Sequence, residues 1–196
     1  MATVAEVQAQ ILGDLHRSDL TAQTVTAMSN VLDKLRMERF WFNEMQASFS
    51  ITTTSAFDLT TYLQTLLQLD TARVWHNGAA IALNRAHWSD LADLDEVDDT
   101  GVPSQWAVHH QTLRLYPTPV EEMVLEVSGL KDLSLTAWCS YAPTLVRTVA
   151  EIELYTLVTH DVQGAQRAVE YEKMEMDVIR KRLPNFATGG EVRGYL

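Results

Sequence analysis

The densest set of chemically capable residues is an acidic run, Asp90 to Asp99, with six carboxylates in ten positions. Carboxylate oxygens at alternating positions can bind Ca²⁺, but a calcium loop also needs a glycine at its sixth position and a glutamate at its twelfth. Counted from Asp93, those positions hold Asp98 and Ser104. The pattern therefore favours a solvated acidic loop. An acidic pair such as Asp95 and Asp98 keeps a hydrolase open as the lowest-ranked hypothesis.

The histidines have no spacing typical of a metal site. His109 and His110 are adjacent in a predicted strand, where neighbouring side chains point to opposite faces, so they are not expected to bind one metal together. His76, His87 and His160 are scattered along the chain. We predict no metal from this pattern.

The single cysteine and the glycine pair near the C-terminus also have plain structural explanations. Cys139 is expected to be a buried structural thiol, and one cysteine excludes an intrachain disulfide, which fits a reducing cytosol. Gly189 and Gly190 follow no strand and precede no Lys-Ser pair, so they are not a phosphate loop. We therefore predict no catalytic site and no cofactor.

The bulk composition sets broad limits on function. The chain has 196 residues, 46% of them apolar, which is enough for one good core. Its net charge of -11 is opposite to that of a protein that holds DNA by its phosphates. No apolar run approaches the roughly 18 residues of a membrane span, and the N-terminus has no basic leader before an apolar stretch.

Two helices are predicted at the N-terminal end. Thr3 and Glu6 make a capping box, so the first helix is expected to begin near Val4. The second helix is expected to end in a core-forming aromatic cluster, residues 40–42. Its predicted apolar face consists of Val25, Met28, Leu32, Leu35 and Phe42.

The pattern then changes to a β insertion. Residues 47–54 alternate and are rich in β-branched side chains. Residues 60–69 are ambiguous, and Leu63, Leu66 and Leu67 fit one or two helical turns. Asn77 and Gly78 indicate a hairpin turn, because both residues tolerate positive φ.

Residues 105–129 read as a strand, a Pro-x-Pro corner and a second strand, which together predict a hairpin. Leu113, Leu115, Met123 and Leu125 are expected to pack the insertion. The residues expected to be available to a neighbouring protein are Arg114, Tyr116, Pro117 and Pro119, together with the turn at Asn77 and Gly78.

Helical patterns return after Ser134. Pro143 suits a first helical position, and the apolar stripe of the helix that follows is wide enough to make it central or shared with another subunit. Asp161 can cap the last helix, which Pro184 ends. Basic residues gather at this C-terminal end, where the helix dipole favours cations: Arg180, Lys181 and Arg182.

The predicted fold class is α+β and mainly α. We expect a single domain over residues 1–183, with a helical bundle body (1–46 and 134–183), an inserted antiparallel β module (47–129) and an extended flexible tail (184–196). The segment from Arg180 to Leu196 has four basic residues and one acidic residue, so its charge is +3.

The order of these pieces resembles the head-to-tail adaptor proteins of tailed bacteriophages, also called connector, head completion or tail accessory proteins. The resemblance is carried by the Gly101-x-Pro103-x-x-Trp106 turn, the Leu-x-Leu-Tyr-Pro-x-Pro segment (113–119) and the helices on either side, and covers roughly residues 1–183.

The resemblance implies a structural, non-enzymatic role. Such proteins form a dodecameric ring below the portal protein, extend the channel and help to retain the genome. They also present a surface for a tail tube, nozzle or tail-fibre protein. Packaged DNA would pass through without sequence-specific binding, and no membrane partner is implied. The location implied is the head–tail interface of the virion, after assembly in the host cytoplasm.

The resemblance also implies that the C-terminal segment reaches along the portal. The residues expected to bind the portal are Arg180, Lys181, Arg182, Phe186, Arg193, Tyr195 and Leu196. A non-viral binding or scaffold protein that uses the β insertion for recognition stays open as the alternative.

Overall fold

The computed structural model describes residues 1–61, 63, 65–93 and 99–181, and its helices and mainly antiparallel sheets make an α+β fold. The chain divides into two compact units. One consists of Met1–Phe42 and Leu133–Leu196, and the other of Asn43–Asp132. We call them the helical unit and the sheet unit.

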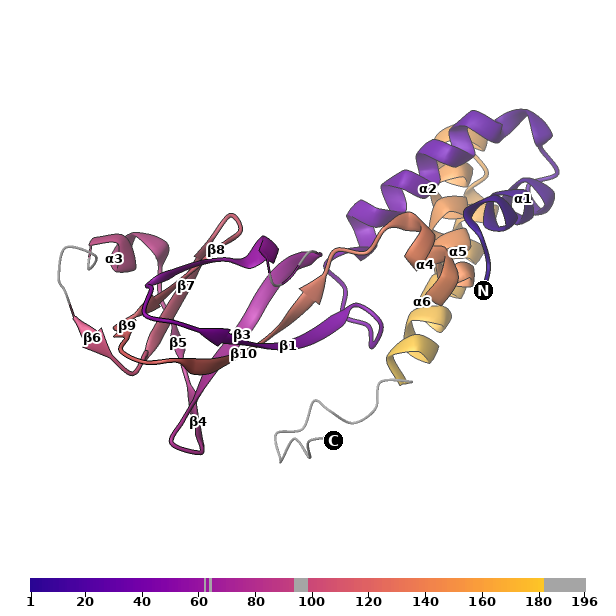
Figure 1. The fold of residues 1–196 in the computed structure, drawn as a ribbon. Helices are drawn as coiled ribbons and strands as arrows, with labels where there is room; N and C mark the ends of the chain where they lie inside the picture. Colours follow the sequence, from indigo (N-terminus) through magenta and orange to yellow (C-terminus); the bar gives the residue numbers. More distant parts are fainter. Residues whose placement is uncertain (62, 64, 94–98, 182–196) are drawn as a thin grey trace. The chain divides into compact units, whose positions relative to one another are not determined.

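The helical unit begins with a capped helix, as predicted. The Glu6 N–H donates to Thr3 Oγ1 over 3.2 Å, and the Thr3 N–H donates to Glu6 Oε2 over 2.7 Å. The helices of this unit (Figure 1) are α1 (Val4–Asp14), η1 (Ser18–Leu20), α2 (Thr21–Leu35), α4 (Leu135–Tyr141), α5 (Pro143–Leu154), η4 (Tyr155–Thr159) and α6 (Val162–Lys181).

Helix α5 is the central element of this unit. It packs against α1, α2, α4 and α6, which explains its wide apolar stripe. Leu145, Val146, Val149 and Leu154 are buried in its core. The predicted cap at Asp161 is confirmed, since its side chain accepts the Gly164 N–H. Ser134 also caps the helix that follows it, by accepting the Ala137 N–H.

The predicted face of the second helix is partly wrong. Helix α2 ends at Leu35, and Val25 is 52% exposed. Thr24 lies on the buried face instead, because its hydroxyl donates to the Leu20 carbonyl over 2.8 Å and so needs no water. The aromatic cluster follows the helix rather than ending it, but Phe40 and Phe42 are buried as expected.

The described residues of the sheet unit form two four-stranded sheets and one two-stranded ladder. The first sheet is antiparallel, in the order β1 (Glu44–Ile51), β10 (Met123–Lys131), β3 (Leu66–His76) and β4 (Ala79–Ala82). The second has the order β2 (Ala56–Asp58), β8 (Thr112–Tyr116), β7 (Gln105–His109) and β5 (Asn84–Arg85). The remaining elements are β6 (Thr100–Gly101) and β9 (Thr118–Pro119), which pair in parallel, η2 (Leu59–Thr61) and α3 (Trp88–Asp93).

The predicted Pro-x-Pro hairpin is wrong. β8 pairs with β7 and β2, whereas β10 pairs with β1 and β3, so the strands on either side of the corner belong to different sheets. Pro117 carries no N–H for a ladder, and Thr118 and Pro119 pair with β6 instead, which suits a segment that crosses between sheets. The packing prediction is confirmed, because Leu113, Leu115 and Leu125 are buried in one core.

Local geometry decides the structure of two shorter segments. The ambiguous stretch 60–69 contains the end of η2 and the start of β3.

The prediction that His110 lies in a strand is wrong. Its φ of 54° places it in the β7–β8 turn. The rings of His109 and His110 are therefore near each other, with centroids 4.2 Å apart, and not on opposite faces.

The predicted Asn-Gly hairpin is confirmed. Asn77 and Gly78 have φ values of 50° and 76° and connect β3 to β4, with Trp75 opposite Ala80. These positive φ values match the twist of a tight hairpin.

Candidate interaction surfaces

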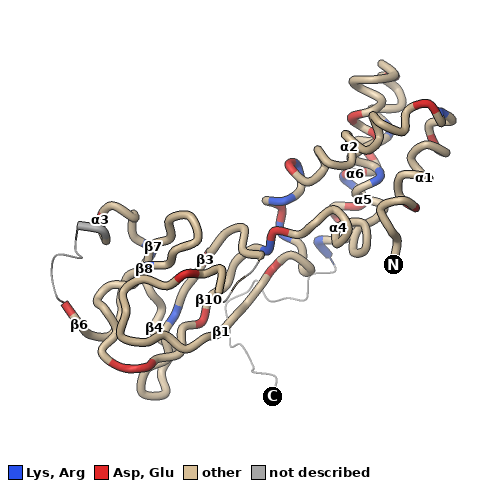
Figure 2. Tube along the Cα trace, turned by 45° about the horizontal axis from the view of Figure 1, so that its top comes forward, with Lys and Arg blue, Asp and Glu red and all other residues tan. Residues whose placement is uncertain are grey.

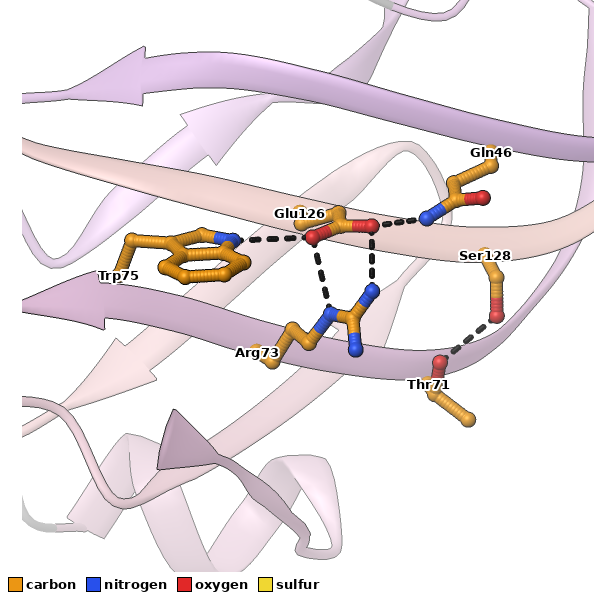
Figure 3. Close-up of polar contacts among 6 residues, drawn as sticks. All are labelled: Gln46, Thr71, Arg73, Trp75, Glu126 and Ser128. Carbon is orange, nitrogen blue, oxygen red and sulfur yellow. Dashed lines mark hydrogen bonds and ion pairs between the residues drawn. The ribbon is translucent and has the colours of Figure 1, made fainter. Parts of the chain in front are cut away.

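A polar cluster lies on the outer face of the first sheet (Figure 3). Glu126 is on the central strand β10, and the strand register places Arg73 of β3 opposite it. The Arg73 guanidinium donates to both carboxylate oxygens, over 2.9 and 2.6 Å, and the Trp75 indole N–H donates over 2.9 Å. Gln46 of β1 donates to the same carboxylate. The cluster therefore joins three strands.

The electrostatics of this cluster are those of a structural ion pair. Glu126 is 8% exposed, and the hydrogen bond from Arg73, helped by Trp75 and Gln46, lowers its pKa to about 2. The same contact raises the pKa of Arg73. A carboxylate that stays ionised at neutral pH, with its oxygens occupied by donors, is unsuited to proton transfer.

The cluster fixes an exposed aromatic side chain. Trp75 is 43% exposed although its N–H is bound, and Val124, directly opposite in the register, is 42% exposed. An aromatic ring held by a hydrogen bond loses little entropy when it is covered, so this pair is a candidate contact for another protein.

The turn residues Asn77 and Gly78 are exposed at the end of the β3–β4 hairpin. The Asn77 amide lies 2.8 Å from a ring nitrogen of His76, whose other ring nitrogen is 3.1 Å from Glu121. The turn is therefore accessible, and its contact with a neighbouring protein stays a prediction.

The corner residues already have partners in their own chain. The Arg114 guanidinium lies 4.9 Å from the ring centre of Trp88, and the Tyr116 hydroxyl donates to Asp99 over 2.9 Å. Pro119 is buried and Pro117 half-buried. This corner is therefore less available than predicted, since Pro119 packs inward and the polar groups of the two strand residues are engaged.

The predicted portal-binding residues are only partly described. Arg180 and Lys181 are in the last turn of α6, as expected, and Arg180 donates to Glu38 over 2.7 Å. Arg182, Phe186, Arg193, Tyr195 and Leu196 lie outside the described residues.

The described part of the chain has no continuous run of basic residues that would suit nucleic acid. Acidic and basic residues are interspersed along the chain (Figure 2). The sheet unit has four basic residues, and Arg73 is paired with Glu126 while Arg85 and Arg114 stack over Trp106 and Trp88. This distribution agrees with the net charge of -11.

The described residues contain no group of three metal-binding side chains, and none of the helices among them is long and apolar enough to cross a membrane. Cys139 is buried, and burial raises the pKa of its thiol, which makes it a poor nucleophile. Asp95 and Asp98 lie outside the described part of the chain.

A buried carboxyl group in the helical unit has the opposite electrostatics to Glu126. Glu151 of α5 is 13% exposed, and its carboxylate lies 3.7 Å from the Arg147 guanidinium. Burial raises the pKa of Glu151 to about 7; Arg147 opposes this shift and the charge of Asp14 adds to it. The effect of desolvation on the pKa of Glu151 is larger than that of Arg147, because the distance between the two side chains is too long for a good hydrogen bond.

The Glu151→Gln variant is expected to be more stable than wild type above pH 7. The pKa of Glu151 is higher in the folded protein than in the unfolded chain, so its protonated form favours folding. Wild-type stability should therefore fall as pH rises from about 4.5 to about 7, by about 2 kcal/mol. Melting of the helical unit between pH 5 and 8 measures this slope. Glu153→Gln on the same helix should keep it, and an unchanged slope in Glu151→Gln would contradict the assignment.

The helices also border an apolar groove of about 500 Å³. Its apolar lining includes Ile152 and Tyr155 at the end of α5 and start of η4, and Val162, Ala165 and Val169 of α6. The charged residues of its lining, Glu170 and Lys173, have opposite signs, so the groove has no net charge that would select a ligand.

Comparison with known proteins assigns the chain to a family. The model of the SU10 adaptor protein family matches residues 2–187, and so spans both units. A search of curated proteins found no match. The chain is thus a phage adaptor, a class of structural virion protein at the head–tail junction. It belongs to the SU10 adaptor family.

The Glu126 cluster was not predicted from the sequence. The sequence does contain the alternation that places these side chains on one face. Arg73 and Trp75 alternate with buried residues on one strand, and Glu126 lies between buried residues on another. Only the register of β3 against β10 shows that the charges face each other, and that register depends on long-range pairing.

Proposed function

We propose that this protein forms a ring that joins the portal to the tail, extends the DNA channel and helps to retain the packaged genome. A dodecamer is the expected ring. The observation that supports this proposal best is the family match over residues 2–187. In the assembled ring, the helical unit would be the body and the sheet unit the inserted module, at the head–tail interface of a virion built in the host cytoplasm.

The charge of the chain suits a channel through which DNA passes. A chain with net charge -11 repels phosphates on average, and in its described part the acidic and basic residues are interspersed (Figure 2), without a continuous basic run to hold DNA. The protein would therefore conduct DNA without sequence-specific binding.

The partners proposed are the portal protein on one side and a tail tube, nozzle or tail-fibre protein on the other. Mixing the purified protein with the purified portal of the same phage and measuring the mass of the product tests the first contact. We expect a complex with one defined stoichiometry. If the protein binds neither the portal nor any tail protein, the proposal is contradicted.

The C-terminal segment is proposed to make part of the portal contact. Deletion of residues 185–196 should leave the helical unit folded and weaken portal attachment by about tenfold or more, because the apolar and basic contacts of this segment are lost. Circular dichroism reports the fold, and sedimentation with the portal reports attachment. Equal attachment by the truncated and complete proteins would remove the segment from the interface.

A further inference from the structure

Helix α6 has a second apolar face that nothing in the described structure covers. Its first face packs into the helical unit through Gly164, Ala168 and Ile179. On a different side, Tyr171, Met174 and Val178 follow each other at spacings of three and four residues. They are 62%, 62% and 45% exposed. We call these three residues the α6 seam.

The spacing of the seam is that of the a and d positions of a heptad, so it suits a second helix lying along α6. Single exposed apolar residues are common on protein surfaces, but an aligned set on one helix is an interaction signal. Met and Tyr are also residue types enriched at protein interfaces.

The residues that flank the seam are acidic. In the heptad that places Tyr171 at a and Met174 at d, Glu170 and Asp177 occupy g positions and Glu175 occupies an e position. Glu170 and Asp177 are exposed and Glu175 is half-buried. A helix packed on the seam would therefore meet negative charge on both sides.

This charge pattern disfavours a second copy of the same seam. In a parallel pair, Glu170 would face Glu175 of the other copy. In an antiparallel pair, Glu170 would face Asp177, and Arg167 at one end would face Lys181 at the other. Both arrangements place like charges together, which is destabilising.

We infer that the α6 seam binds an amphipathic helix of a different protein whose flanking positions carry Lys or Arg. This inference rests on the proposed function only in placing that partner in the phage particle. The charge complementarity, and not the apolar area alone, would select the partner.

The test uses two labelled helical peptides and the complete protein. Both peptides are about three heptads long with Leu at a and d, and they carry either Lys or Glu at all e and g positions. Fluorescence anisotropy should show the Lys peptide binding at least about tenfold more tightly than the Glu peptide, since several flanking pairs change sign.

Matched variants locate the binding. Val178→Asp should abolish binding of the Lys peptide, whereas Val25→Asp, at a comparably exposed apolar residue of α2, should leave it unchanged. The triple variant Glu170→Lys, Glu175→Lys and Asp177→Lys should reverse the preference between the peptides. Circular dichroism tests whether each variant is folded. If Val178→Asp does not fold, Met174→Ser is used in its place.

The inference is overturned if the two peptides bind equally, if neither binds, or if Val178→Asp behaves like Val25→Asp. Self-association of the wild type that disappears in Val178→Asp would also overturn it, by placing a second copy on the seam. If the peptides do not bind as expected but the protein still forms a complex with the portal, the inference about the α6 seam is rejected and the adaptor proposal is unaffected.

Discussion

The Gly129→Ala variant is expected to lose most of the stability of its sheet unit. Gly129 lies in β10 at a register shift against β3, where the two backbones approach closely. A Cβ at this position would overlap the carbonyl oxygen of Gln68 and come within 3.1 Å of Leu69 Cα. These are backbone atoms, which cannot rotate away as a side chain would, so strand pairing must give way.

We expect a loss of about 3 kcal/mol or more, measured as a shift of the urea midpoint for the sheet unit. Gly13→Ala is the control, because Gly13 is in a helix and a Cβ added there would meet no neighbouring group within 4 Å. That variant should gain up to about 1 kcal/mol. A Gly129→Ala variant with the wild-type midpoint for the sheet unit would show that this register shift tolerates a side chain.

Replacement of Glu126 by alanine is expected to have the second-largest effect. It leaves the Arg73 guanidinium and the Trp75 indole N–H without their acceptor on a partly buried surface. The loss expected is about 3 kcal/mol, most of it the cost of the unpaired donors. Glu122→Ala, just before the same strand, is the exposed control and should change stability by less than about 0.5 kcal/mol.

The pH dependence of this pair has a defined sign. The pKa of Glu126 is about 2 in the folded protein, below its ordinary value of 4.5, so its ionised form favours folding. The stability it contributes is complete above about pH 4.5 and is lost as pH falls toward 2. Urea unfolding at pH 3 and 6 should show this loss in wild type and not in Glu126→Ala. Equal losses in both proteins would mean that other groups cause the acid sensitivity.

Glu126 and Glu151 give the two units opposite responses to acid. As the pH falls from 7 to 4.5, the helical unit should gain stability because Glu151 takes up a proton. Below pH 4.5 the sheet unit should lose stability because Glu126 takes up a proton. The two carboxyl groups are both poorly exposed, so the difference comes from their surroundings. Glu126 accepts hydrogen bonds from three side chains, whereas Glu151 has a long ion pair with Arg147 and the like charge of Asp14 beside it.

Local signals in the sequence predicted local structure well. The Thr3–Glu6 capping box, the Asp161 cap and the Asn77-Gly78 turn each depend on neighbours a few residues away, and each is confirmed. The wide stripe of α5 correctly indicated a central helix, because a helix that packs against several others carries apolar residues over a wide part of its surface.

Predictions that required distant pairing were less accurate. The alternation around Pro117 and Pro119 correctly identified two strands and their buried residues, but it could not tell whether they pair with each other or belong to two sheets. On α2 the residue type predicted that Val25 is buried, but Thr24 is buried instead. Burial of Thr24 is favourable because its hydroxyl donates to the Leu20 carbonyl. The α6 seam was not predicted because residue type alone does not show which of two apolar stripes on that helix is packed.

Disruption of the gene in the phage, followed by electron microscopy of the products, tests the adaptor role most directly. We expect DNA-filled or leaking heads and separate tail components that do not join, and recovery of infectious particles when the purified protein is added to them. Particles with heads and tails joined at wild-type frequency in the absence of this protein would contradict the adaptor role.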